Sequence, residues 1–213
     1  MSRPASDDNA RRTRAEQNAD SGRRLLKALV DLMAEKGYND TSAAEIGVRA
    51  GFSRAMVHAR FGTKDALLEE LLRAEWEQRF LGGVVDGLTG LQRVLAYADQ
   101  LGQLADEDER FLRAMFVLSF EAARGSAVVT PRIVRFLEEL EAGVADAVTV
   151  GQTDGSVRAD VQPSDAAREC MINACGIAYA WVLLPGTDLH TELARWRRRI
   201  VADYGRTPST FNI

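Results

Sequence analysis

Apolar residues recur at three- and four-residue spacing through most of this chain, which is the period of an α-helix. After a polar start, the first stripe contains Leu25, Leu29 and Met33, and Gly37 follows where a helix commonly ends. A second stripe, with Leu68, Leu72, Trp76 and Phe80 at every fourth position, predicts another long helix. Further helices are predicted over residues 88–104, 108–124, 130–151, 163–184 and 187–204. The pattern therefore predicts an all-α chain of about nine helices.

Two short helices are predicted between residues 42 and 61. Ser42-Ala-Ala-Glu45 has the form of a capping box and marks the start of the first one. Ala50-Gly51-Phe52-Ser53 supplies a glycine turn, an apolar anchor and an N-cap serine, so the next helix is expected to run from Ser53 to about Phe61. Two short helices joined in this way form a helix-turn-helix, whose second helix enters the major groove of DNA.

The side chains around this motif suit contacts with DNA. Near the start of the second helix, Arg54 has the donors for a guanine, and Ala55 and Met56 have the methyl surface for a thymine. Hydroxyl and basic side chains around the motif are expected to bind phosphates. The predicted DNA-contacting residues are Thr41, Ser42, Ser53, Arg54, Ala55, Met56, His58, Arg60 and Lys64.

Charge is unevenly distributed along the 213 residues. The net charge is −4, but residues 1–64 carry twelve Lys and Arg against eight Asp and Glu, while the remainder carries fifteen against twenty-three. A basic front segment on an acidic body is the arrangement that local phosphate binding requires.

The motif residues together resemble the signature of the TetR family of transcription repressors. The resemblance rests on these segments, in this order and spacing: Glu35-Lys36-Gly37-Tyr38, Thr41-Ser42, Ile46, Ala50-Gly51-Phe52-Ser53, Phe61 and Lys64-Asp65-Ala66-Leu67-Leu68. It is close over residues 21–72 and weaker through residues 151–161 and 176–185. The chain departs from the family pattern at His58-Ala59-Arg60-Phe61, where His58 replaces a phosphate-contacting tyrosine.

The resemblance implies an N-terminal three-helix DNA-binding domain followed by a C-terminal helical ligand-binding and dimerisation domain. The boundaries expected here are a disordered tail over 1–20, the helix-turn-helix domain over 21–66, the regulatory domain over 67–205 and a C-terminal tail over 206–213. As a homodimer, the protein is expected to bind a palindromic double-stranded operator and to leave it when a small effector binds. The alternative is a DNA binder that is constitutive or responds to a protein partner.

Two further sets of residues are predicted for the regulatory domain. Aromatic and sulfur-containing side chains suit irregular apolar cavities, and the ligand-binding candidates are Trp76, Phe80, Met115, Phe116, Phe120, Met171, Cys175 and Tyr179. The last two helices carry more apolar surface than one internal face needs, as in a four-helix interface between two copies. The dimer-interface candidates are Ala174, Ala178, Trp181, Trp196 and Ile200.

Enzyme function is disfavoured because the chain lacks a glycine-rich phosphate loop, a Gly-x-Ser-x-Gly elbow and metal-spaced histidines. No cofactor, metal or catalytic residue is predicted. No apolar stretch approaches the roughly 20 residues of a membrane span, and Cys170 and Cys175 are expected to be free buried thiols. The protein is therefore expected to be cytoplasmic and without a membrane partner.

Overall fold

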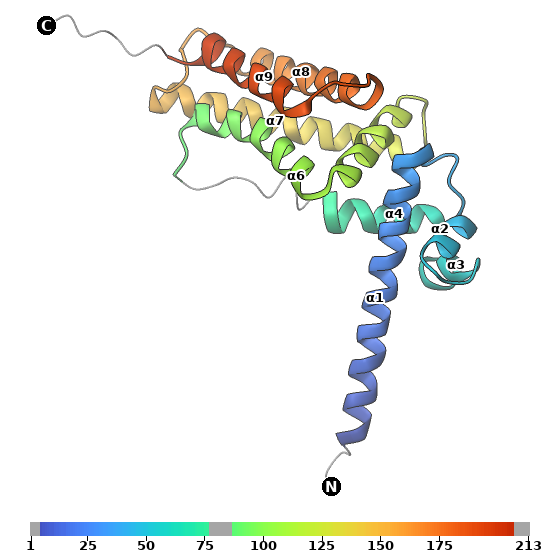
Figure 1. The fold of residues 1–213 in the computed structure, drawn as a ribbon. Helices are drawn as coiled ribbons and strands as arrows, with labels where there is room; N and C mark the ends of the chain where they lie inside the picture. Colours follow the sequence, from blue (N-terminus) through green and yellow to red (C-terminus); the bar gives the residue numbers. More distant parts are fainter. Residues whose placement is uncertain (1–4, 77–86, 207–213) are drawn as a thin grey trace, which may run out of the picture. The chain divides into compact units, whose positions relative to one another are not determined.

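The computed structural model describes residues 5–76 and 87–206, and these residues form eight α-helices and one π-helical turn (Figure 1). Within them the β-structure is an isolated bridge between Val157 and Gly205. The prediction of an all-α fold is confirmed. The chain divides into two compact units, Met1–Trp76 and Glu77–Ile213, so the first unit extends beyond the predicted boundary at residue 66.

The first unit is built around one long helix. α1 spans Ala5–Lys36, α2 spans Ala43–Arg49, α3 spans Met56–Phe61 and α4 spans Lys64–Leu71, and the π-helical turn η1 covers Leu72–Trp76. Their shared core consists of side chains with at most 1% exposure, namely Leu25, Leu29, Met33, Ile46, Val57, Leu67, Leu68 and Leu71. The periodicity of the sequence therefore identified the inward face of each helix.

Residues 5–20, expected to be part of a disordered tail, are helical and form the first half of α1. The segment has few large apolar residues, but it also lacks glycine, and its Ala, Arg, Glu and Gln residues favour the helix. In Figure 1 this half of α1 extends beyond the other helices of its unit. The polar character of this segment therefore argued against its burial, but it did not argue against a helical conformation.

α3 begins later than expected. Ser53 was predicted to cap it, but the helix starts at Met56, with Ala55 as an N-cap that makes no side-chain hydrogen bond. The carbonyl of Ser53 instead accepts from the amide of Met56 at 3.1 Å, which closes a turn before the helix. By contrast, the capping box predicted at Ser42 and Glu45 is present.

The described residues of the second unit form four helices, which lie along one another (Figure 1). α6 spans Gly90–Ala122, α7 spans Val129–Asp154, α8 spans Pro163–Leu183 and α9 spans Leu189–Tyr204. The two helices predicted over 88–104 and 108–124 correspond to the two parts of α6, which meet at a kink at Asp108, whose φ of −156° and ψ of 79° are not helical. The Asp108 carboxylate accepts from the amide of Phe111 at 3.0 Å, as an N-cap does.

α6 and α7 approach most closely at two glycines. A Cβ on Gly90 would overlap the backbone of Gly151 and the carbonyl oxygen of Ala147, so a larger residue does not fit there. The amide of Gly90 donates to the Asp154 carboxylate at 2.7 Å. The start of α6 is therefore locked onto the end of α7.

No helix within residues 5–76 and 87–206 is long and apolar enough to cross a membrane.

Candidate DNA interface and regulatory site

The turn between α2 and α3 is held by close backbone packing. Gly51 has a φ of +78°, which favours glycine. Gly47 leaves room for the carbonyl of Ser53, which a Cβ would overlap. From α1, the Arg24 guanidinium donates to the carbonyl of Ala50 at 2.6 Å and lies 4.4 Å from the centre of the Phe52 ring. Arg24 and Gly47 were not predicted, although a glycine inside a short helix is a signal of close approach.

A small exposed surface surrounds the start of α3. Its exposed side chains are those of Ser53, Arg54, Ala55, His58 and Ala59, and Met56 is half-buried beside them. Arg54 also lines a groove of about 350 Å³ with Val48, which is 55% exposed, and Ala44. Among the predicted DNA-contacting residues, Ser53, Arg54, Ala55, Met56 and His58 are thus placed together.

Arg60 is turned away from that surface. Its guanidinium donates to the Ser21 hydroxyl at 2.9 Å and lies 3.4 Å from the Asn18 side-chain oxygen, both on α1. A Cβ on Gly22 would lie 2.9 Å from Arg60 Nη2, so the glycine makes room for it. That Arg60 contacts DNA stays a prediction, and in this structure its guanidinium joins α3 to α1.

Lys64 and Thr41 also serve the fold. Lys64 Nζ donates to the carbonyls of Tyr38 and Thr41 at 2.9 and 2.8 Å, and it lies 4.0 Å from the centre of the Tyr38 ring. The Thr41 hydroxyl is buried and donates to the carbonyl of Gly37 at 2.7 Å. Burial, together with a hydrogen bond to Asp65, raises the pKa of Tyr38. The phosphate roles predicted for Lys64 and Thr41 are therefore replaced by internal contacts.

Ser42 remains exposed, but its side chain belongs to the capping box. Its hydroxyl accepts from the amide of Glu45 at 3.2 Å, and the Glu45 carboxylate accepts from the amide of Ser42 at 2.9 Å. Lys36 of α1 donates to the same carboxylate at 2.8 Å. The hydrogen bond from Lys36 and those from Ser42 lower the pKa of Glu45 to about 2.

This arrangement of α1 to α4 matches the family model described as bacterial regulatory proteins, tetR family, over residues 25–71. Over these residues the chain is similar to the TetR family. An uncharacterised HTH-type transcriptional regulator of Bacillus subtilis, YdgC, is 28% identical over 113 residues, which are 50% of this chain and 58% of that protein. One of Mycobacterium tuberculosis, Rv2250c, is 29% identical over 143 residues, or 66% of this chain and 71% of the relative. The part of this chain that matches spans little more than half of the Bacillus relative.

Solved structures share the fold of this chain. A transcriptional regulator from Saccharomonospora viridis, in complex with choline, has a TM-score of 0.74 at 18% identity, covering 89% of this chain and 100% of the other. The SmeT–triclosan complex has a TM-score of 0.73 at 20% identity, covering 88% and 93%. NalD, the secondary repressor of the MexAB-OprM multidrug efflux pump in Pseudomonas aeruginosa, has a TM-score of 0.66 at 19% identity, covering 89% and 98%.

The residues predicted to bind a ligand in this chain occupy different environments. Met115 is buried in the core, whereas Phe116, Phe120 and Met171 are half-buried. Phe116 of α6 meets Trp181 of α8 edge to face at 6.3 Å between ring centres, and Phe120 meets Tyr179 at 5.4 Å. Cys175 and Tyr179 are exposed on α8. The side chain of Trp76, and Phe80 altogether, lie outside the described residues.

An arginine that was not predicted lies beside these rings. The Arg113 guanidinium is 4.6 Å from the centre of the Trp181 ring, and it donates to the carbonyl of Val182 at 3.2 Å. Its side chain is 32% exposed and lies 3.7 Å from the Glu109 carboxylate. The α6–α8 contact thus combines aromatic rings with one accessible cation.

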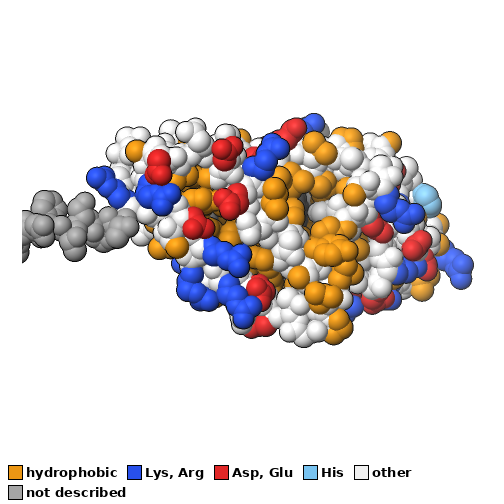
Figure 2. Space-filling model, turned by 90° about the horizontal axis from the view of Figure 1, so that it is seen from above, with side chains coloured by type: hydrophobic (Ala, Val, Ile, Leu, Met, Phe, Trp, Pro, Cys, Tyr) orange, Lys and Arg blue, Asp and Glu red, His pale blue; other side chains and the backbone are white. Residues whose placement is uncertain are grey.

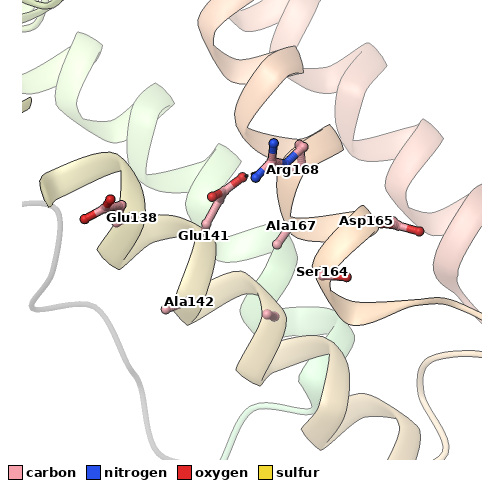
Figure 3. A pocket seen from close by; sticks show the side chains of 8 residues that line it. Glu138, Glu141, Ala142, Ser164, Asp165, Ala167 and Arg168 are labelled. Atoms are coloured by element: carbon pink, nitrogen blue, oxygen red, sulfur yellow. Dashed lines mark ion pairs between the residues drawn. The ribbon is translucent and has the colours of Figure 1, made fainter. Parts of the chain in front are cut away.

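A separate groove of about 640 Å³ lies between α7 and α8 (Figure 3). Glu138, Glu141 and Asp165 supply carboxylates, and Arg168 pairs with Glu141 at 3.3 Å. The predicted ligand-binding residues do not line this groove, and its polar lining differs from the apolar cavity that the sequence predicted. Within the described residues, no group of three His, Cys, Asp or Glu side chains is placed to hold a metal ion.

The predicted dimer-interface residues lie mostly inside the unit. Ala178, Trp181, Trp196 and Ile200 are between 1% and 8% exposed, and Ala174 is half-buried, so this part of the prediction is corrected. The exposed apolar side chains of α8 are on its other side, namely Ile172 at 60%, Tyr179 at 56% and Leu183 at 52%. Figure 2 shows hydrophobic side chains gathered in the middle of one face, with charged side chains around them.

The two cysteines of α8 differ in their exposure to solvent. Cys170 is buried, and burial raises the pKa of its thiol to about 11. Cys175 was also expected to be buried, but it is exposed on the outer side of α8. Both are free thiols, as predicted.

Proposed function

We propose that this regulator is a repressor that binds a palindromic operator as a homodimer and is released by a small, mostly apolar molecule. The observation that carries the proposal is the short α3 helix, fixed by α1 and α2, with Arg54, Ala55 and His58 left exposed around its start. A fixed helix with a few outward side chains near its N-terminus is what major-groove reading requires. Such a protein acts on chromosomal DNA in the cytoplasm.

The homodimer is supported by the outer side of α8. Ile172, Cys175, Tyr179 and Leu183 follow each other at three- or four-residue spacing and are all exposed. A continuous apolar stripe on the surface of a helix is covered in most soluble proteins. A second copy of the chain, related by a two-fold axis, would present the same stripe, and the two stripes would then cover each other.

The effector proposal is supported by the α6–α8 ring contacts and by two of the similar structures. One of those proteins is in complex with choline and another with triclosan, which are small molecules. In this chain, Phe116 and Phe120 offer aromatic faces, and Arg113 offers a cation. We propose a mostly apolar ligand with an acidic or polar group that Arg113 meets.

The chain connects the two units through η1, which ends at Trp76 directly before the second unit begins. A π-helical turn interrupts the regular hydrogen bonding of an α-helix, and such turns are frequent at functional sites. We propose that ligand binding in the second unit alters the chain at this point and changes the separation of the two α3 helices in the dimer. Half-sites have a fixed spacing, so a change of a few ångströms releases one of them.

DNA selection tests the first part of this proposal. The full-length protein is incubated with a random duplex library, and the bound fraction is sequenced. A palindrome of roughly 15–25 base pairs should be enriched, and its affinity should fall steeply with salt. Arg54→Ala should relax the preference at one base pair at a cost of about 1–3 kcal/mol. Failure to enrich any palindrome would contradict the proposal.

Operator release tests the second part. A panel of apolar acids, phenols and quaternary amines is added to the complex, and both Trp fluorescence and DNA release are measured. Phe116→Trp should block the effector and leave DNA binding intact. If no compound both binds and releases DNA, the constitutive or protein-responsive alternative should replace this one. A repressor should also lower transcription from a promoter that contains the selected operator.

A further inference from the structure

The imidazole of His58 is fixed by a hydrogen bond to the end of its own helix. Its Nδ1 lies 2.9 Å from the carbonyl oxygen of Gly62. A carbonyl oxygen can only accept, so Nδ1 must carry the hydrogen. A neutral imidazole has one N–H, and the exposed Nε2 is therefore left with a lone pair and can only accept.

The backbone of Gly62 creates this arrangement. Gly62 ends α3 with a φ of +77°, and its amide donates to the carbonyl of His58 at 3.0 Å. The left-handed φ turns the Gly62 carbonyl back toward the ring, and glycine adopts that φ without steric cost. His58 is thus tied to Gly62 by its main chain and its side chain together.

We propose that Nε2 of His58 reads a base in the major groove by accepting a hydrogen bond from the base's amino group, which is N6 of adenine or N4 of cytosine. The inference rests on the proposed function. Phosphate oxygens, guanine O6 and thymine O4 only accept hydrogen bonds, so the neutral ring cannot bond to them through Nε2. The exposed amino groups of adenine and cytosine donate, and they are the partners that this tautomer fits.

Charged groups on the helices packed against α3 are engaged elsewhere. On α2, Glu45 pairs with Lys36 and Arg49 pairs with Glu35, each at 2.8 Å. On α4, Lys64 donates to backbone carbonyls and Asp65 accepts from Tyr38. On α3 itself, Arg60 is bound to Ser21.

Protonation of the ring changes Nε2 from a hydrogen-bond acceptor into a donor. Once the ring is protonated, both nitrogens donate, and Nε2 then fits guanine or phosphate in place of an amino group. The preferred base at one operator position should therefore change between pH 8 and pH 6. A lysine at this position, which only donates, should behave at pH 8 as the protonated histidine does at pH 6.

The test uses the full-length protein and the operator selected from the random library. Duplexes with each of the four bases at each position of a half-site are compared at pH 8. At one position, adenine and cytosine should bind about 3- to 10-fold tighter than guanine and thymine, as expected for one net hydrogen bond. His58→Lys should reverse this order, and His58→Phe should remove it. His58 is exposed, and circular dichroism of each variant confirms that it folds.

His190→Gln is the matched control, because His190 is the other histidine of the chain and lies in the second unit. It should leave the base preference and its change with pH as in the unmodified protein. If His58→Phe instead weakens all four duplexes equally, the ring contacts phosphate and the inference is overturned. If no sequence is enriched at all, the proposed function fails, which is a different outcome from an enriched operator without this base preference.

Discussion

Several polar side chains of the N-terminal unit are used to position α3. Arg24 holds the turn before α3, Arg60 joins α3 to α1, and Lys64 closes the loop after α1. Each guanidinium or ammonium group donates a hydrogen bond to an oxygen of a neighbouring segment of the same unit. Basic residues in a DNA-binding domain are thus divided between those that hold the recognition helix and those, such as Arg54, that face outward.

Arg60→Ala should therefore reduce stability. The Ser21 hydroxyl loses the hydrogen bond from Arg60 while keeping its bond to the Asn18 carbonyl, and the aliphatic part of Arg60 no longer packs on α1. The free energy of unfolding should therefore fall by about 1–3 kcal/mol. Urea unfolding followed by circular dichroism measures it. Arg54→Ala, at an exposed site, should change stability by less than about 0.5 kcal/mol. This role would be contradicted if the Arg60→Ala protein unfolded like the unmodified one while its affinity for DNA depended less on salt.

At this scale the sequence predicts side-chain chemistry better than side-chain partners. The exposure of Arg54, Ala55 and His58 follows from the helical period, because Val57 and Phe61 occupy the inward side of α3. The partners of Arg60 and Lys64 depend on how α1 crosses the other helices, and spacing along the chain does not contain that information. The tautomer of His58 likewise depends on the backbone of Gly62.

At the scale of single elements, helix starts are fixed by local side chains. Thr63 accepts from the amide of Ala66 at 3.0 Å at the start of α4. Thr89 and Gln92 form a capping box at the start of α6, like that of Ser42 and Glu45 at α2. These contacts lie within three residues of each other, which is why the start of α2 was predictable from the sequence.

The capping box of α2 should respond to acid. The pKa of Glu45 is lowered from 4.5 to about 2 in the folded protein, so its contribution is complete above pH 4.5 and is lost as the pH falls through 2. Glu45→Gln should be less stable than the unmodified protein at pH 6, and the difference should shrink toward pH 2. Urea midpoints across this range test it. Glu16→Gln, at an exposed site on α1, should show no such convergence.

The contact between α6 and α7 should not tolerate a methyl group at Gly90. A Cβ there overlaps backbone atoms, which cannot move without separating the helices, so Gly90→Ala should cost about 3 kcal/mol or more. Gly102→Ala on the same helix is the control, because its Cβ would lie 3.6 Å from His190 and 3.7 Å from Leu193, at ordinary contact distances. That variant should be stabilised by up to about 1 kcal/mol. Thermal unfolding that ranks the two variants the other way would contradict this packing.

For the whole molecule, periodicity predicted the helices but not which side of α8 is internal. α8 is apolar on both sides, with Ala166, Ala167, Cys170 and Ala178 inward and Ile172, Tyr179 and Leu183 outward. A helix that is apolar all round gives no preferred direction. The interface was therefore predicted on the inner side, and the packing of α6, α7 and α9 against α8 determines which side is covered.

Ile172→Lys should convert the proposed dimer into a monomer. The side chain is 60% exposed in the single chain, so the substitution should leave the fold intact and place a charge where the second copy would pack. Light scattering at micromolar concentration should show half the mass, and operator binding should fall with it. Val134→Lys, at a 47% exposed site on α7, should remain dimeric. An unmodified protein that is already monomeric would end this proposal.

The kink divides α6 into two segments that can move separately. A regular α-helix passes an axial push from turn to turn, because its hydrogen bonds keep successive turns at a fixed spacing. At Asp108 the backbone leaves the helical conformation, and the carboxylate of Asp108 restarts the helix at Phe111. The first part is anchored on α7 by Gly90, while the second carries Phe116 and Phe120 against α8. The second part can therefore act as a lever that pivots at Asp108 while the first part stays in place.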